Sequence, residues 1–167
     1  QDNGESPVRR VEPPQVAVDL PLEAFIPEDY IEDLPLRLGA YQRLARAADT
    51  EEAVVIGEEL RDRFGPTPEA VENLLYVVRV KVLAGACDVE TVIRQGSNIA
   101  IRLRHGVGGA KALLQNDLGK VAQVGDSLVR VPMKGQWTEI LAWVLERMAS
   151  FREKMLEMAE AAQQAQS

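Results

Sequence analysis

The stretch EELRDRFGPTPEAVENLL, residues 58–75, contains a helix end followed directly by a helix start. Gly65 can take the left-handed backbone conformation that closes a helix, and Pro66 prevents that helix from continuing. Thr67 is a good N-cap, and Pro68 suits the first helical position because an N–H there would have no partner. The stretch therefore predicts two helices that fold back on each other as a hairpin.

Apolar residues at helical spacing define this hairpin and one further helix before it. The first helix is expected over residues 36–48, and the second begins at a Thr50 cap with Glu51 and Glu52 in its first turn. The predicted buried residues of the three helices are Leu38, Tyr41, Leu44 and Ala45, then Ala53, Ile56, Leu60 and Phe64, then Val71, Leu74, Leu75, Val78 and Val82.

In the second part of the chain the apolar spacing changes to the period of two that is typical of strands. Residues 87–104 and residues 120–133 each predict a β-hairpin, and residues 108–117 predict a short helix between them. Residues 15–21 predict one more strand, with one face formed by Val16, Val18 and Leu20.

Residues 137–162 predict one long helix that closes the domain. Its apolar residues recur at alternating spacings of four and three, as in a heptad stripe: Trp137, Leu141, Val144, Met148, Phe151, Met155 and Met158. The overall prediction is an α+β fold with a helical half, a small antiparallel sheet made of hairpins, and a long C-terminal helix.

The composition also predicts how the chain is divided. Residues 1–14 combine Pro, Gly, Ser and charged residues with little to bury, which predicts a flexible linker. Residues 15–167 form one domain, because 167 residues with 46% hydrophobic content suffice for a single core. Within it, residues 20–35 predict an extended acidic segment that is anchored by Phe25 and Tyr30.

Several classes of protein are disfavoured. The formal net charge is -7 and no basic patch stands out, which argues against direct nucleic-acid binding. Cys87 is the only cysteine, so no intrachain disulfide can form and a cytoplasmic location is expected. No apolar run reaches the roughly 18 residues of a membrane span.

The sequence offers no recognisable catalytic, cofactor or metal site. A Gly-x-x-x-x-Gly-Lys-Ser/Thr phosphate-binding loop is absent. His105, the only histidine, lies beside glycines without a partnering nucleophile, and Cys87 is expected to be a buried apolar residue. One cysteine and one histidine do not form a Cys/His zinc site. We therefore expect no catalytic residue, no cofactor and no metal in this chain.

Glu59 and Asp62 share one outer helical face, because residues three apart lie on the same side of a helix. Taken alone, with Arg61 and Arg63 beside them, these carboxylates are typical of an ordinary solvated surface.

Three motifs in a fixed order carry a family resemblance: VDLPLEAFIPEDYI, then RLGAYQRLA, then EELRDRFGPTPEAVENLL, with the two hairpins and the long helix after them. In this order they resemble the C-terminal domain of bacterial transcription-repair coupling factor. The resemblance begins at about Val16 and extends to the end of the long helix. The helical motifs match by residue, whereas the hairpins match by pattern.

The resemblance implies a non-catalytic regulatory domain of a larger protein. Intact family members are ATP-dependent DNA translocases that displace RNA polymerase stalled at a lesion and recruit UvrA for nucleotide excision repair. ATP, DNA and RNA polymerase would be bound by the parent protein outside this chain. The domain itself would dock on the UvrB-like module of the same polypeptide and mask the surface that UvrA uses. In the Glu-x-x-Asp-Arg-Phe-Gly motif, Glu59 and Asp62 would be the interdomain-contact residues, facing arginines of that module.

Two other functions are open at this point. A free-standing adaptor would use the heptad stripe of the long helix to bind a partner protein. An enzyme would use the acidic segment at residues 20–35 to hold a divalent metal, although that segment has prolines where a calcium loop needs a central glycine.

Overall fold

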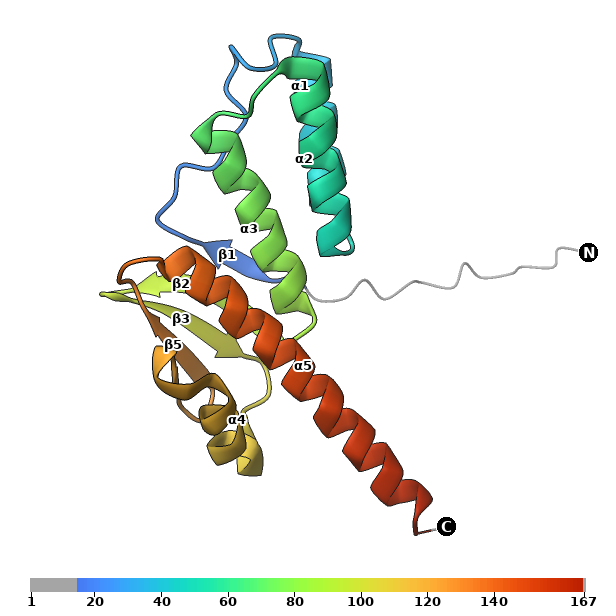
Figure 1. Ribbon diagram of the computed structural model, residues 1–167, viewed down its shortest axis with the longest axis vertical. Helices are drawn as coiled ribbons and strands as arrows, with labels where there is room; N and C mark the ends of the chain where they lie inside the picture. Colours follow the sequence, from blue (N-terminus) through green and yellow to red (C-terminus); the bar gives the residue numbers. More distant parts are fainter. Residues whose placement is uncertain (1–14, 167) are drawn as a thin grey trace, which may run out of the picture.

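The computed structural model describes residues 15–166, so the predicted linker at 1–14 lies outside the described residues. The helices are α1 (Leu34–Ala45), α2 (Thr50–Phe64), α3 (Glu69–Gly85), α4 (Lys111–Leu118) and α5 (Trp137–Gln164). The strands are β1 (Ala17–Asp19), β2 (Val89–Gln95), β3 (Asn98–Leu103), β4 (Gln123–Val124) and β5 (Leu128–Pro132). Short 3-10 helices, η1 (Gly108–Ala110) and η2 (Gly119–Val121), flank α4. The fold is α+β, with the helical half first and the long helix last (Figure 1).

The strands form one sheet in the order β1-β2-β3-β5-β4. Both predicted hairpins are present, and β3 also pairs antiparallel with β5. At one edge the sheet departs from the antiparallel prediction, because β1 pairs parallel with β2 and the sheet is therefore mixed. Three helices separate β1 from β2 and supply the long connection that a parallel pair requires.

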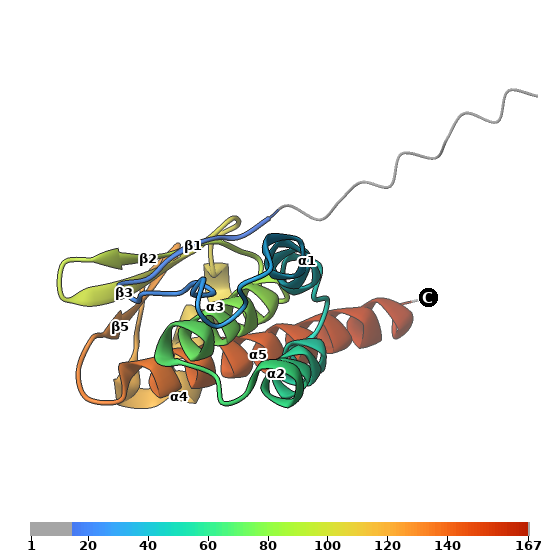
Figure 2. The ribbon, with the colours of Figure 1, turned by 90° about the horizontal axis from the view of Figure 1, so that it is seen from above.

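α3 takes part in two hydrophobic cores. The larger core lies between one face of the sheet and helices α3, α4 and α5, whereas the smaller one lies among α1, α2, α3 and the acidic segment. Val71 and Val78 belong to the smaller core, and Val80 and Ala84 belong to the larger core. Figures 1 and 2 show α3 leaving the helical half and running beside α5 over the sheet. One helix thus connects the two halves.

The α2–α3 hairpin forms where the sequence predicts it. Gly65 follows α2 with φ +89° and ψ -172°, a backbone region that is essentially restricted to glycine. The Tyr30 hydroxyl donates a bifurcated hydrogen bond to the carbonyl oxygens of Leu60 (3.1 Å) and Gly65 (2.8 Å). These hydrogen bonds connect the acidic segment to the turn between α2 and α3.

The helix caps differ from the prediction by one residue. Asp49, not Thr50, caps α2, and its carboxylate accepts a hydrogen bond from the Glu52 N–H at 2.8 Å. Thr67 makes no cap bond, because Pro68 occupies the N-cap position of α3; the Thr67 hydroxyl donates to the Glu72 carboxylate. At the start of α2, the Asp49 carboxylate is a stronger acceptor than the Thr50 hydroxyl.

Three apolar expectations are wrong, all at the edge of the helical half. Leu38 is 51% exposed and Ala45 is exposed, because α1 lies at the outside and turns mainly Leu44 inward. Phe25 is 45% exposed and does not anchor the acidic segment. Isoleucines fill that part of the smaller core instead, namely Ile26 and Ile31.

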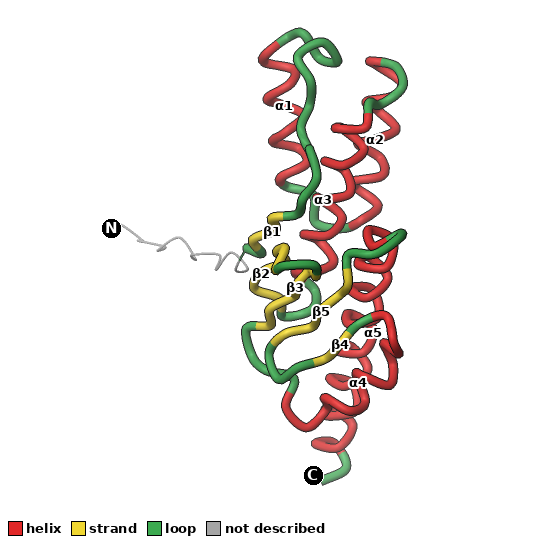
Figure 3. The backbone as a smooth tube through the Cα atoms, turned by 90° about the vertical axis from the view of Figure 1, so that its left-hand side faces the viewer, coloured by secondary structure: helices red, strands yellow, loops and turns green. Residues whose placement is uncertain are grey.

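α5 covers the sheet with only the first part of its length. Leu141, Val144 and Met148 of the predicted stripe are buried, and Phe151 is half-buried. Met158 is 65% exposed, and Figure 1 shows the end of the helix extending beyond the rest of the domain. The tube in Figure 3 shows the sheet lying against α5 and α4 on one side. The heptad stripe therefore belongs to the core at its start and to the solvent at its end.

Substituting Gly65 by Ala should lower the free energy of unfolding by about 1–3 kcal/mol, because the turn would hold the alanine in a backbone region that only glycine adopts readily. No heavy atom lies within 4 Å of that Cβ position, so a steric clash would not contribute. Urea unfolding of the variant measures the loss.

Gly39→Ala is the matched control, because Gly39 lies inside α1 and its Cβ position is also open. That variant should gain about 0.5–1 kcal/mol through better helix propensity. Equal unfolding midpoints for Gly65→Ala and the wild type would contradict the role of the glycine in the turn.

Candidate interdomain-contact surface

The second half of α2 presents Glu59 and Asp62 outward. Both side chains are exposed, while Leu60 on the opposite side is buried in the smaller core. The amphipathic pattern of α2 fixes this orientation, because Ala53, Ile56 and Leu60 must face α1 and α3. The predicted contact residues therefore lie on a surface that another protein can reach.

Glu59 already has a cation within the domain. The Arg43 guanidinium of α1 donates to Glu59 Oε2, and the Glu59 side chain is still 47% exposed. This hydrogen bond lowers the pKa of the Glu59 carboxyl and raises that of Arg43, and the charge of Arg63 lowers the pKa of Glu59 further. Arg43 thus neutralises the charge of Glu59, and the second carboxylate oxygen can still accept a hydrogen bond from a further partner.

Asp62 has a different environment. Within residues 15–166 it makes no hydrogen bond and no ion pair. Arg61, its neighbour in sequence, instead pairs with Glu72 of α3 at 3.1 Å and so connects α2 to α3. The sequence places Arg61 and Arg63 beside the two carboxylates, but it did not indicate that Arg43 would pair with Glu59. The RLGAYQRLA motif contains Arg43, but only the packing of α1 against α2 places it beside Glu59.

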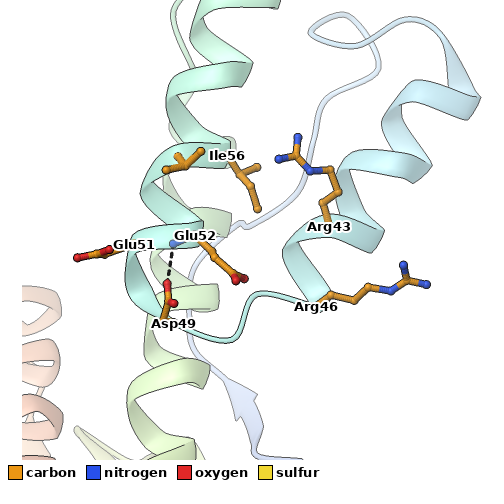
Figure 4. Close-up of a pocket in the computed structure, with 7 residues that line it drawn as sticks. Arg43, Arg46, Asp49, Glu51, Glu52 and Ile56 are labelled. Atoms are coloured by element: carbon orange, nitrogen blue, oxygen red, sulfur yellow. Dashed lines mark hydrogen bonds between the residues drawn. The ribbon is translucent and has the colours of Figure 1, made fainter.

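A groove runs between α1 and α2 beside these residues, which we call the α1–α2 groove. Its lining includes Leu36, Gly39, Arg43, Arg46, Glu59 and Arg63. An adjoining hollow is lined by Arg43 and Arg46 together with the start of α2 (Figure 4). In this hollow, Asp49 caps α2 and the Arg46 side chain points away from α2 (Figure 4).

Other residues singled out by the sequence are not brought to this surface. His105 is 86% exposed, and its Nδ1 lies 3.1 Å from the Asp88 carboxylate. The Cys87 thiol lies in the larger core, where it donates to the carbonyl oxygens of Leu83 (3.1 Å) and Leu145 (3.3 Å). Burial raises the pKa of Cys87 to about 12. As predicted, the thiol behaves as a buried apolar group.

Within the described part of the chain, no three histidine, cysteine, aspartate or glutamate side chains gather to hold a metal ion. None of the helices in residues 15–166 is long and apolar enough to cross a membrane. The acidic segment at 20–35 therefore has no metal-site geometry in this structure, and it serves as packing for the smaller core.

The fold and this surface define an α+β domain whose candidate site is an exposed, charged helical face rather than an enclosed pocket. A family model described as the TRCF domain matches residues 20–108, and the chain belongs to that family. The matched range covers the whole helical half and the β2–β3 hairpin.

Named relatives agree with this assignment. A transcription-repair-coupling factor from Mycobacterium bovis is 38% identical over 92 residues, which is 55% of this chain and 7% of that protein. Another from Staphylococcus epidermidis is 32% identical over 117 residues, which is 67% of this chain and 10% of that protein. The chain thus spans about a tenth or less of the length of these relatives.

The fold also matches a solved structure, a crystal structure of the C-terminal domain of transcription-repair coupling factor. The TM-score is 0.71 at 21% identity, and the match covers 84% of this chain and 95% of that one. The predicted family and the predicted α+β fold are therefore both confirmed.

The Arg43→Gln substitution should raise the pKa of Glu59 towards its ordinary value, because the hydrogen bond from Arg43 is the largest cause of the lowering. A carboxyl whose pKa is lowered on folding contributes stability above its ordinary pKa, and that contribution is lost as the pH falls through the lowered value. Acidification should therefore cost the wild type more stability than the variant. NMR titration of the side-chain carboxyl carbons measures the pKa directly.

Arg46→Gln is the control for this titration, because Arg46 lies one turn beyond Arg43 and is not in contact with Glu59. It should leave the pKa of Glu59 almost unchanged. A Glu59 titration that is the same in wild type and Arg43→Gln would show that the ion pair does not persist in solution.

Proposed function

We propose that this chain is the non-catalytic regulatory domain of a transcription-repair coupling factor and that it acts as an autoinhibitory lid. It docks on the UvrB-like module of the same polypeptide through the outer face of α2 and masks the surface that UvrA would bind. Glu59 and Asp62 are the proposed contact residues. Family membership and the exposure of both carboxylates support the proposal.

The parent protein is proposed to be an ATP-dependent DNA translocase that displaces stalled RNA polymerase and recruits nucleotide excision repair in the cytoplasm. Its ATP and DNA would be bound by other parts of the polypeptide. The contribution of this chain is to control access to the UvrA-binding surface, which requires neither a cofactor nor a catalytic residue of its own.

The single observation that carries the docking proposal is the position of Asp62. It lies in the last turn of α2, where the helix dipole is negative, and it has no cation partner within residues 15–166. A carboxylate at a helix C-terminus costs about 0.3–1 kcal/mol in an exposed setting. Local stability therefore does not explain an aspartate at this position, whereas contact with an external cation does.

The proposed control is a population shift. If docking favours the closed state by about 3 kcal/mol, fewer than about 1% of molecules expose the UvrA-binding surface at any time. Exposed charge pairs each contribute only about 0.2–1 kcal/mol, so the carboxylates must become at least partly buried on docking to provide such a bias. Events elsewhere in the parent protein would then release the lid.

The Asp62→Asn substitution should weaken docking by about tenfold or more, because it leaves a partner arginine without its carboxylate. The same substitution should slightly stabilise the isolated domain, because it removes a charge that is unfavourable to α2. Isothermal titration of the chain into a purified UvrB-like module measures the affinity, and thermal unfolding measures the stability.

Glu153→Gln is the matched control for docking, because it removes one exposed carboxylate on α5, remote from this surface. Its affinity for the module should equal that of the wild type. In the full-length parent, charge reversal at Glu59 and Asp62 should increase UvrA binding. Unchanged affinity in the Asp62→Asn titration would remove this residue from the mechanism.

A second candidate function is a protein-binding adaptor that uses the end of α5. It is favoured by Met155 and Met158, which lie three residues apart and therefore on one face of the projecting part of that helix; Met155 is half-buried and Met158 is 65% exposed. A projecting helix with such side chains is typical of a helix-pairing surface.

The adaptor function predicts that the chain associates with itself or with a partner through the end of α5. Sedimentation equilibrium at increasing concentration should then detect association that Met158→Glu abolishes. Gln163→Glu is the control, because it also adds one negative charge to an exposed position near the end of α5, but on another side of the helix. A monomer at millimolar concentration would argue against self-pairing through this helix.

A further inference from the structure

We infer that the partner surface that meets the outer face of α2 and the α1–α2 groove presents both signs of charge: a cation opposite Asp62, and one carboxylate opposite each of Arg46 and Arg63. This inference rests on the proposed docking through α2 and specifies the chemistry of its partner. A partner face with arginines alone would not fit the charges that the groove carries.

The first argument is the charge of the groove itself. Its lining contains three guanidinium groups, those of Arg43, Arg46 and Arg63, but only one carboxylate, that of Glu59. Arg43 and Glu59 compensate each other in an ion pair. The groove is therefore locally positive, although the whole chain carries a net charge of -7.

The second argument is that Arg46 and Arg63 form no ion pair within residues 15–166. Arg63 lies over the Phe64 ring, with 5.2 Å between its guanidinium carbon and the ring centroid, which limits where that side chain points. Arg46 follows the last residue of α1 and points away from α2 (Figure 4). Both cations are thus available to an incoming group.

Helix-dipole stabilisation is the ordinary explanation for arginines at helix ends. Each of these two helix ends, however, already carries another arginine that the fold uses. Arg43 near the end of α1 pairs with Glu59, and Arg61 near the end of α2 pairs with Glu72. Arg46 and Arg63 are the second arginine of each end, and the domain gives neither of them an ion pair.

A folded protein fits this arrangement better than a nucleic acid. The phosphates of a nucleic acid would meet Asp62 and Glu59 on α2, and also Asp49 and Glu51 at its start. Those carboxylates repel a continuous line of negative charge. A protein surface can place a carboxylate and an arginine a few ångströms apart, as the α1–α2 face does itself.

The decisive experiment replaces Arg46 and Arg63 by Gln and measures docking to the purified UvrB-like module. Loss of two exposed charge pairs should weaken docking by about threefold for each substitution, and by about tenfold for the double variant. A purely basic partner predicts the opposite sign, because removing like charges would strengthen docking. Tighter binding by the double variant would therefore overturn the inference.

Arg102→Gln is the matched control, because it removes an exposed arginine of β3 that has no ion pair in the described part of the chain. It should leave docking unchanged at physiological salt, where charges farther apart than a Debye length are screened. If the double variant docks as the wild type does but melts at a lower temperature, the inference is also overturned. The two arginines would then only stabilise the ends of their own helices.

Two further outcomes separate this inference from the function on which it rests. Docking that is lost in Asp62→Asn but unaffected in the arginine variant keeps the proposed function and rejects the mixed-charge partner. No docking of the wild-type chain rejects both. Fluorescence anisotropy with a labelled DNA duplex completes the test, because wild-type binding that the double variant loses would assign the groove to nucleic acid instead.

Discussion

The burial of α3 in two cores is the constraint on which the rest of the structure depends. Its first turns pack against α1 and α2, and its last turns pack against the sheet and α5. Among the described residues, no other helix contributes to both cores. The orientation of α2, and with it the direction in which Asp62 points, is therefore set by the same helix that supports the sheet.

The charged surface follows from this packing. With α3 in place, Arg61 is used to connect α2 to Glu72, while α1 brings Arg43 to Glu59. Two arginines and two glutamates are thereby paired within the domain. Asp62, Arg46 and Arg63 are left with no ion pair in residues 15–166, and they define what an external partner must supply. The specificity of the surface thus lies in the groups that the fold leaves unpaired.

Local signals made much of this structure predictable from sequence. Gly65-Pro66 marks a helix end by backbone chemistry alone, and the two hairpins are marked by their period of two. The parallel pairing of β1, the exposure of Phe25 and the Arg43–Glu59 pair were not predictable. Each of these depends on how segments distant in sequence pack together, which residue spacing within one segment does not determine. The contact role of Glu59 and Asp62 came from the family resemblance and stays a prediction.

Cys87 lies between α3 and α5, with its thiol directed at carbonyl oxygens of both helices. Because its pKa is raised to about 12, almost no thiolate exists at neutral pH, and the sulfur is shielded from reagents while the larger core is closed. The only cysteine of the chain is thus a natural chemical reporter. Its alkylation rate reflects how often these two helices separate.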